Sequence, residues 1–435
     1  MFLEKESVKM ELKREITYVE FFDHKAVENI CACLTQVPDR VILVGDESDN
    51  LPCHCERYEK LFAERGFKNV RFAHEPISKN KLQSIVDALC RIVETYEDCV
   101  FGLTGGEDLY LVAMGIVCER YREKNLKMHR FLLSEGYILD CDQDGQTIGK
   151  NRQPKLSVEE NIRLYGGEVI YDEEKPETTH RWNMNQEFRE DICAMWEICC
   201  SEGNRQWNAQ IEVLRRAAQA TPGSGLSVHV ARSVVESNLR REGESMVVND
   251  TILDALQEKG LLKHWYIDEN VVIVSFKNDQ VKACLTTAGQ LLELTVYLAA
   301  LDARDENGKK VYHNSLTGVY IDWDGRLGSA NGGEDSHNEI DVLMMHGVVP
   351  VFVSCKNGYV DADELYKLNV VAQQFGNSYA KKVLVAPALN TYGKHADYIE
   401  NRAKDMGICI IWDLPADDPE ARSEIVGSFW YDKEE

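Results

Sequence analysis

The segment spanning residues 338–356, NEIDVLMMHGVVPVFVSCK, most constrains the fold of this chain. Charged and apolar residues alternate before the turn signal His346-Gly347, and a β-branched run follows that signal. Alternation with period two, a glycine turn and a β-branched run together predict two strands joined by a tight hairpin. The remaining elements must therefore be arranged around a sheet that contains this hairpin.

One face of this hairpin is predicted to carry a chemical site. Because residues two apart on a strand share a face, Glu339 and Asp341 should point the same way, and so should Ser354 and Lys356. Pairing around the turn brings Asp341 near the Ser354–Lys356 end. A carboxylate for a hard metal ion would then lie beside an ammonium, a pairing suited to activating water against a phosphodiester. The alternative is an ordinary ion pair with no catalytic role.

The hairpin resembles the core of the PD-(D/E)xK nucleases, in which an Asp on one strand precedes a (D/E)-x-K tripeptide on the next. The surrounding order also resembles restriction-endonuclease-like folds: helix 290–301, strand 318–323, the hairpin, helix 362–375, strand 382–386, helix 394–406 and strand 408–412. The resemblance implies that Asp341 and Lys356 are catalytic. It also implies a divalent metal, Mg²⁺ or Mn²⁺, held by Asp341 and the backbone carbonyl of Cys355.

The tripeptide of this chain departs from the family pattern, because Ser354 stands where the second carboxylate is usual. Two acids could replace the missing metal ligand. Glu339 lies on the same strand as Asp341, and Glu293 lies on the helical stretch that precedes the strands. The fold family places such an acid on its first helix, so both residues are candidates for the catalytic and metal site.

The first 170 residues alternate between strand and helix patterns. Apolar runs at 16–22, 40–45, 69–73 and 99–103 read as strands, and amphipathic stretches at 25–36, 58–66 and 81–97 read as helices. Such alternation predicts an α/β fold with a doubly wound, Rossmann-like sheet, in which ligands bind at the carboxyl ends of the strands.

At one of these strand ends stands Thr104-Gly105-Gly106, which leads directly into the helix predicted at 109–124. Paired glycines allow a ligand to approach the backbone closely, and a helix N-terminus offers N–H groups and a positive dipole end to a phosphate. The alternative is a plain strand-to-helix turn with a glycine-rich bend.

A strand that ends in a Thr-Gly-Gly turn and feeds a helix with small residues resembles the CARF domains, which are CRISPR-associated sensors of cyclic oligoadenylates. The resemblance implies that Thr104, Gly105 and Gly106 bind such a ring, tetra-adenylate or hexa-adenylate, at the interface of a symmetric homodimer. It further implies contacts from the loops at the same sheet edge, Asp23-His24 and Gly45-Asp46. The family often has a basic residue after the glycines, whereas this chain has Glu107-Asp108.

The middle of the chain is predicted to connect two domains. The charged stretch 172–179, DEEKPETT, has no hydrophobic pattern and is taken as part of a linker over 171–186. Helix patterns, including one at 228–242, and two strands at 265–276 resemble a winged helix within a connecting module at 187–285. The expected division is therefore a CARF domain at 1–170, this linker and module, and a nuclease domain at 286–435.

Composition restricts the partners and the compartment. The net charge of −24 argues against nonspecific attraction to nucleic acid, although it leaves a locally basic cleft possible. The 14 cysteines are scattered, as expected in a reducing compartment. The opening residues lack the apolar core of a signal peptide and no apolar run approaches membrane-spanning length, so a cytoplasmic location is expected.

Two functions from different classes fit these features. The first is a metal-dependent endonuclease of type III CRISPR antiviral defence, activated by a cyclic oligoadenylate and cleaving DNA, RNA or both. The second is a CARF and winged-helix regulator that binds nucleic acid through a nuclease-like domain without strong catalysis. Ser354 is the best support for the regulator, whereas retention of Lys356 favours the enzyme. A constitutive nuclease would leave the Thr-Gly-Gly turn unexplained.

Overall fold

The computed structural model describes residues 15–133, 135–171, 178–221, 223, 225–325 and 337–431. The chain forms two compact units, Met1–Lys155 with Arg163–Gly166, and Leu156–Ile162 with Gly167–Glu435. The first unit therefore ends its main stretch at Lys155, before the domain boundary expected at residue 170. The physical reason is that strand β8 (Glu168–Val169) pairs with β12 (Asn314–Asp322) in the sheet of the second unit.

A seven-stranded sheet of order β3-β2-β1-β4-β5-β6-β7 forms the centre of the first unit. The five strands β3, β2, β1, β4 and β5 run parallel to one another, whereas β6 pairs antiparallel with β5 and β7 pairs antiparallel with β6. The strands are β1 (Ile16–Phe21), β2 (Arg40–Asp46), β3 (Arg71–Ile77), β4 (Asp98–Gly102), β5 (Lys127–Leu132), β6 (Tyr137–Cys141) and β7 (Thr147–Arg152). The helices are α1 (Cys31–Gln36), α2 (Leu51–Glu64), α3 (Leu82–Thr95) and α4 (Asp108–Arg120). The predicted Rossmann-like α/β architecture is confirmed.

Two local predictions in this unit need correction. The helix expected at 25–36 is a 3-10 turn, Ala26–Asn29, followed by the short helix α1. The pattern of residues 128–140 likewise predicts the first arm of a hairpin whose second arm is 146–150. The structure has two strands there, β5 and β6, because Gly136 at φ +69° turns the chain between them. Neither change moves the carboxyl ends of β1, β2 and β4, where the ligand site was expected.

The second unit contains a six-stranded mixed sheet of order β16-β15-β14-β13-β12-β8. Its strands beyond β8 are β12 (Asn314–Asp322), β13 (His337–His346), β14 (Val349–Cys355), β15 (Lys381–Val385) and β16 (Ile408–Ile411). Its helices include α11 (Gln290–Asp302), α12 (Ala362–Gly376), α13 (Lys394–Asp405) and α14 (Pro419–Gly427). The predicted hairpin is confirmed: β13 and β14 pair antiparallel, with Val342 opposite Val353.

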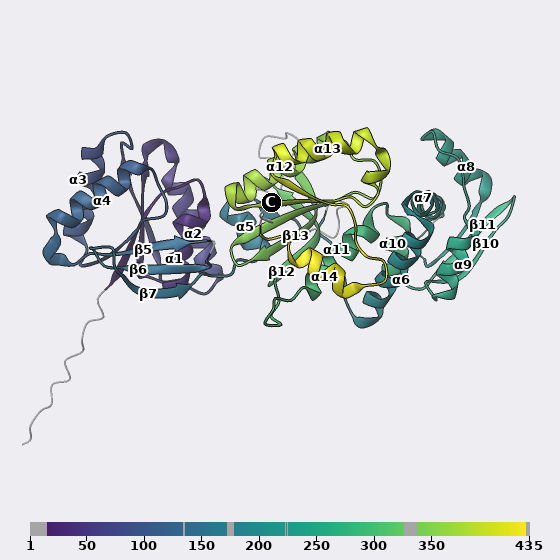
Figure 1. The fold of residues 1–435 in the computed structure, drawn as a ribbon, viewed down its shortest axis with the longest axis horizontal. Helices are drawn as coiled ribbons and strands as arrows, with labels where there is room; N and C mark the ends of the chain where they lie inside the picture. Colours follow the sequence, from purple (N-terminus) through teal and green to yellow (C-terminus); the bar gives the residue numbers. More distant parts are fainter. Residues whose placement is uncertain are drawn as a thin grey trace, which may run out of the picture. The chain divides into compact units, whose positions relative to one another are not determined.

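Helices cover both faces of this sheet (Figure 1). Val342 and Met344 of β13, with Val351 and Val353 of β14, belong to a buried core that includes apolar residues of α11. Because side chains alternate along a strand, Asp341 and its neighbours on the same face point to the opposite side, where α12 lies. The hairpin therefore separates an apolar face from a face that carries charged residues.

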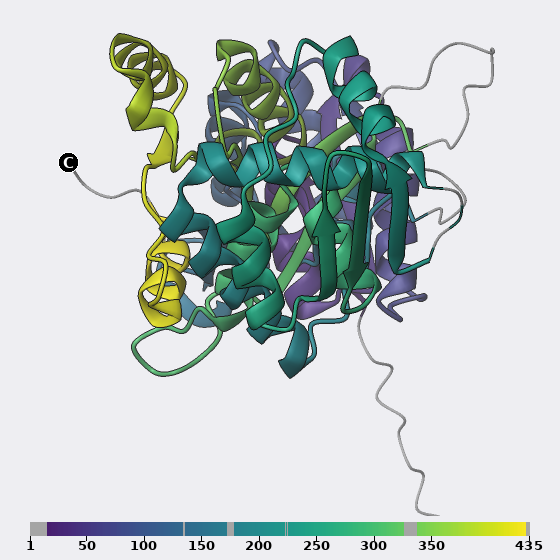
Figure 2. The same cartoon turned by 90° about the vertical axis from the view of Figure 1, so that its right-hand side faces the viewer.

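The middle segment adds a small sheet of order β10-β11-β9, whose strands lie side by side in Figure 2. Its elements are α6 (Gln186–Glu202), α7 (Asn204–Ala220), β9 (Ser227–Ala231), α8 (Arg232–Arg241), α9 (Asp250–Glu258), β10 (Leu262–Ile267), β11 (Val271–Phe276) and α10 (Asp279–Thr286). The helix predicted at 228–242 is wrong in its first part, because the alternating Val228 and Val230 are buried and form β9.

This winged-helix-like segment is not separate from the sheet beside it. Buried residues of α6, α7, α9 and the three strands share one core with α11, β13 and β14. The expected module at 187–285 and the expected domain at 286–435 consequently pack as one body. Helix α5 (Val158–Leu164) precedes β8, and residues 172–177 of the expected linker lie outside the described residues. Within the described part of the chain, the helices are too short or too polar to span a bilayer.

Candidate active site and ligand site

The β13–β14 hairpin holds Asp341 in a fixed orientation. The backbone N–H of Cys355 donates to Asp341 Oδ2 at 2.6 Å, and Ser354 Oγ lies 3.3 Å from the same oxygen. Burial raises the pKa of Asp341 above its ordinary value, although Lys356 and the Cys355 amide both favour the carboxylate. The residue that replaces the usual second acid therefore supports the orientation of the first one.

Lys356 lies between two carboxylates. Its Nζ is 3.1 Å from Glu364 Oε2 and 3.9 Å from Asp341 Oδ2. Burial alone would lower the pKa of Lys356, but the charges of Asp341 and Glu364 hold it above its usual value. Lys356 is therefore an ammonium at neutral pH and can stabilise negative charge, but it does not accept a proton in this arrangement.

Glu364 is a site residue that sequence reasoning missed. It lies in the first turn of α12, where Asp361 caps the helix by accepting from the Asp363 N–H. Burial would raise its pKa, but Lys356 and then Lys367, at 3.2 Å, lower it below its ordinary value. The spacing of Glu364 and Lys367, three residues apart on a predicted helix, was the available signal.

Glu339 and Glu293 reach the site from different sides. Glu339 shares the face of Asp341, and burial raises its pKa against a hydrogen bond from Tyr320. Glu293 lies on α11, near the opposite face, where Gln290 Nε2 donates to it at 3.2 Å. Burial, and then the charges of Asp341 and Glu339, raise the pKa of Glu293 well above its ordinary value.

A cavity of about 320 Å³ opens over this charged face. The hairpin and α12 supply its lining: His337, Asn338, Glu339, Ile340, Asp341, Val353, Ser354, Lys356, Glu364, Lys367, Leu368 and Val371. The structure therefore brings Asp341, Glu339, Ser354 and Lys356 together in one cavity. Glu293 contributes its charge from behind the sheet and does not belong to this lining.

The carboxylates of this region are suited to a hard cation, but their side chains are not close enough together to form a complete set of ligands. Within the described ranges, no group of three His, Cys, Asp or Glu side chains is close enough to hold a metal ion. Three carboxyls, Asp341, Glu339 and Glu293, nevertheless have raised pKa values in one region. Burial is the main cause of each shift, and the charge of Asp341 raises the pKa of Glu339 and of Glu293 further. A bound divalent ion would stabilise these carboxylates, so the residues fit such an ion.

The first unit carries the predicted ligand site at the carboxyl ends of its parallel strands. Gly105 is buried, and a Cβ at this position would lie 2.5 Å from the carbonyl oxygen of Phe21. Gly106 has φ +85°, in the left-handed region. The glycines are therefore required by the contact between this turn and β1, in addition to any approach by a ligand.

Each predicted polar residue around this turn has a partner within the unit. The Thr104 hydroxyl accepts from the Phe131 N–H at 2.7 Å, and Asp23 accepts from the Lys25 N–H at 2.8 Å. Asp46 accepts from Ser48 and from the Lys79 N–H, and these bonds lower its pKa. His24 stands beside Phe22, with ring centres 5.4 Å apart. These side chains shape the strand ends, and Gly45 packs closely against Leu51 and Phe22.

A cation that sequence reasoning missed stands at the same edge. Lys79 follows β3, and its Nζ lies 3.2 Å from Glu107 Oε1. Glu107 is the N-cap residue of α4 and makes no side-chain cap hydrogen bond. Lys79 therefore supplies a positive charge where this chain has Glu107-Asp108 in place of a basic residue. The signal was its position just after a parallel strand.

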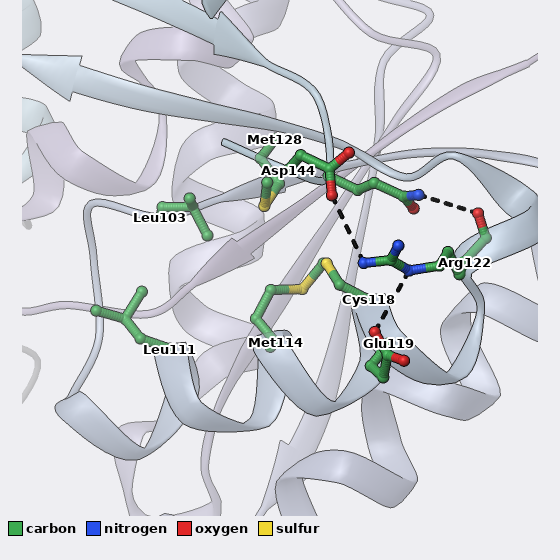
Figure 3. A pocket seen from close by; sticks show the side chains of 10 residues that line it. Leu103, Leu111, Met114, Cys118, Glu119, Arg122, Met128 and Asp144 are labelled. Atoms are coloured by element: carbon green, nitrogen blue, oxygen red, sulfur yellow. Dashed lines mark hydrogen bonds and ion pairs between the residues drawn. The ribbon is translucent and has the colours of Figure 1, made fainter. Parts of the chain in front are cut away.

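Helix α4 presents apolar side chains to the surface. Leu111 is 49% exposed, Val112 50% and Ile116 38%, and a Cβ at Gly115 would meet open space. A cavity of about 400 Å³ lies beside this helix, with Leu103, Met114, Cys118 and Met128 in its lining (Figure 3). Arg122 closes one end through ion pairs with Glu119 at 3.4 Å and Asp144 at 3.7 Å.

Several basic residues of the winged-helix-like segment pair with neighbouring acids. Arg215 and Arg216 both pair with Glu212 and with Glu242, and Arg240 lies 3.4 Å from Glu236. This neutralisation gives no support to nucleic-acid recognition by that segment.

Comparison with known proteins gives matches among solved structures. No protein-family model matches the chain, and no curated protein is similar to it in sequence. Protein VC1899 from Vibrio cholerae superposes with a TM-score of 0.68 at 17% identity, over 95% of this chain and 98% of that one. Can2 from Sulfobacillus thermosulfidooxidans, in complex with cyclic tetra-adenylate, superposes with a TM-score of 0.64 at 15% identity, over 96% and 99%. The chain therefore shares the fold of these two proteins over nearly its whole length.

Proposed function

We propose that this protein is a metal-dependent nuclease of type III CRISPR defence, activated by a cyclic oligoadenylate bound to its CARF-like first unit. The observation that carries the proposal is the cluster on the β13–β14 hairpin. There a partly buried Asp341, fixed by the Cys355 amide, lies 3.9 Å from the Lys356 ammonium in a cavity. A structural ion pair would need no cavity over it and no further acids around it.

The residues of the cavity have distinct roles in this proposal. Lys356, held as an ammonium, orients the attacking water or a phosphoryl oxygen and stabilises the negative charge that develops on phosphorus. Glu364 fixes the position of that ammonium at 3.1 Å. The Ser354 hydroxyl and Cys355 amide keep one carboxylate oxygen of Asp341 engaged, which leaves the other oxygen to face the cavity.

Asp341, with the Cys355 carbonyl and Glu339, would hold a divalent ion, Mn²⁺ or Mg²⁺, and Glu293 would add its charge from behind. A bound ion supplies Lewis-acid activation of water and of the scissile phosphate. The oxygen donors favour a hard cation over a soft one.

The activator site lies at the ends of β1, β2 and β4. The N-terminus of α4 offers backbone N–H groups to a phosphate, and Lys79 offers a charge. A ring with rotational symmetry is matched most simply by two copies of this edge, so a homodimer is the proposed receptor. Cyclic tetra-adenylate, which Can2 binds, is the favoured activator over hexa-adenylate. Moving a closed state from 1:99 to 99:1 requires about 5.5 kcal/mol of preferential binding.

A cleavage assay tests this proposal. The full chain is incubated with labelled RNA, single-stranded DNA and duplex DNA, with Mn²⁺ or Mg²⁺, and with or without cyclic tetra- or hexa-adenylate. We expect cleavage that requires both metal and ring. Absence of cleavage under every combination would contradict the proposed function.

Glu293→Gln should increase the metal concentration needed for half-maximal cleavage by about 10-fold, because residues behind a metal site typically contribute that much to affinity. Glu339→Gln should act in the same direction, and Glu258→Gln, on α9, is the control. A metal requirement unchanged in both variants would show that neither acid replaces the carboxylate absent at Ser354.

The same variant has a pH-dependent effect on stability. Because the pKa of Glu293 is raised in the folded chain, the folded state binds more protons and loses stability as pH rises above the ordinary carboxyl pKa. Metal-free Glu293→Gln should therefore melt at a higher temperature than the wild type near neutral pH, and the difference should shrink toward acid pH. Thermal melts in EDTA across pH check this sign.

Val112→Glu should convert the proposed dimer to a monomer, because it places a charge in the exposed apolar stripe of α4. Sedimentation should show the mass fall by about half, and ring binding should weaken with it. Val234→Glu, at an exposed valine of α8, is the matched control. A wild-type chain that sediments as a monomer with the ring present would contradict the dimer.

A further inference from the structure

Exposed tyrosines gather on one part of the second unit. Of the seven exposed tyrosines among the described residues, four lie between residues 359 and 398. They are Tyr359 on the loop after β14, Tyr366 on α12, Tyr392 at the end of a 3-10 turn and Tyr398 on α13. None of these four side chains is buried, so packing in the core does not explain why the residues are aromatic.

These rings contact one another in an ordered way. Tyr359 stacks on His395 with ring centres 4.5 Å apart and planes within 12°, and Tyr392 meets Tyr359 edge-on at 5.5 Å. His395 Nε2 bonds the Val360 carbonyl at 2.7 Å, which fixes its ring. Tyr359 nevertheless remains 58% exposed, so the ring pile has a surface on which a further flat group can stack.

Tyr359 and Tyr366 are close in the chain to residues that line the cavity. Arg402 donates to the Tyr366 hydroxyl and lies 5.8 Å from the centre of its ring, and Tyr366 precedes Lys367, which lines the cavity. Tyr359 follows Lys356 by three residues, so their Cα atoms are at most about 11 Å apart. Helices α12 and α13, which carry three of these residues, lie side by side (Figure 1).

Charge cannot be the main attraction of this surface. Helix α13 carries three basic residues, Lys394, Arg402 and Lys404, against three acidic ones, Asp397, Glu400 and Asp405. A protein with a net charge of −24 gains little from phosphates, whereas stacking of bases on aromatic rings needs no positive charge and tolerates any base sequence. Bases paired in a duplex cannot offer their faces to such a platform.

We propose that Tyr359, His395, Tyr392 and Tyr398 form a base-stacking subsite that holds an unpaired stretch of the nucleic-acid strand beside the cavity. This inference rests on the proposed nuclease function and adds the residues that position the strand. The subsite takes bases a few nucleotides from the phosphate at Lys356. Single-stranded DNA and single-stranded RNA share the required chemistry, and duplex does not.

Binding measured without cleavage tests the subsite. In an Asp341→Ala chain with the ring present, fluorescence anisotropy follows labelled single strands of about 12 nucleotides, as DNA and as RNA. Adding Tyr359→Ala should weaken binding by about 5- to 150-fold, and Tyr359→Phe should restore it. Tyr266→Ala, at an exposed tyrosine of β10, is the matched control and should change nothing. Equal loss in that control would overturn the assignment.

A strand with consecutive abasic positions completes the test. Removing the bases should weaken binding to the chain that retains Tyr359. It should have little further effect on binding to the chain that carries Tyr359→Ala, because both changes remove the same contact. Additive losses, tight binding of duplex, or wild-type binding by Tyr359→Ala would each overturn the subsite. In a chain that retains Asp341 and can cleave, Tyr359→Ala should raise KM more than it lowers kcat. If the wild type cleaves nothing, the nuclease proposal fails, while the anisotropy result still decides the subsite.

Discussion

Asp341→Ala and Lys356→Ala should each reduce ring-activated cleavage by at least about 10³-fold, corresponding to about 4 kcal/mol of transition-state stabilisation. Asp341→Ala removes the oriented carboxylate, and Lys356→Ala removes the ammonium that its two carboxylate neighbours keep charged. Both residues lie in the second unit, so calorimetry should show unchanged binding of the ring by the first unit. Cleavage rates are measured at saturating metal and ring.

Matched controls separate this effect from general loss of structure. Asp363→Ala changes an exposed acid at the start of α12, and Lys310→Ala changes an exposed lysine, so both should cleave like the wild type. Removing Lys356 leaves two partly buried carboxylates without their cation, so thermal melts must accompany the rates. Wild-type cleavage by either Asp341→Ala or Lys356→Ala would falsify the active-site assignment.

Gly105→Glu should reduce ring affinity by at least about 100-fold and remove activated cleavage, with the dimer retained. Its Cβ would meet the Phe21 carbonyl at 2.5 Å, so the turn must move, and the carboxylate would repel a phosphate. Gly105→Ala shares the steric change without the charge and should give a smaller loss. Gly225→Glu, at a glycine with open space around it, is the control. Ring affinity is measured by calorimetry.

Lys79→Ala provides a second arm that does not disturb the backbone of the turn. Loss of a charged contact to a phosphate should weaken ring binding by about 10-fold. Lys60→Ala, on the exposed surface of α2, should have no effect. If Gly105→Glu still binds and responds to the ring, the ligand site lies elsewhere on the first unit.

Sequence patterns predicted the parts of this molecule that depend on local periodicity. The alternation in residues 338–356 was sufficient for the hairpin, because period two and a glycine turn determine both strands and their register. It also placed Asp341 beside Ser354 and Lys356, since pairing around a turn relates those positions directly. Similarly, parallel strands put the Gly105 turn, Asp23 and Asp46 at one sheet edge.

Features that depend on packing between elements were not predictable in the same way. Glu364 and Lys79 join their sites from helices or loops whose facing direction no strand pattern reveals. Glu293 was assigned to the correct helix, but only the packed structure places that helix behind the hairpin. The strand β9 was missed because Val228 and Val230 are followed immediately by a helix pattern, and the first three residues fit either period.

The two-residue strand β8 has a practical consequence for preparing the second unit alone. It pairs with Ile321 and Asp322 of β12, at the outer edge of the six-stranded sheet, and Ile170 N–H adds a bond to Tyr320. A fragment that begins after residue 171 would leave this edge open, and an open strand edge invites other chains to add to it. Expression fragments should therefore begin ahead of Leu156, whose N–H bonds Gly347 of the hairpin turn, or they will tend to self-associate and precipitate.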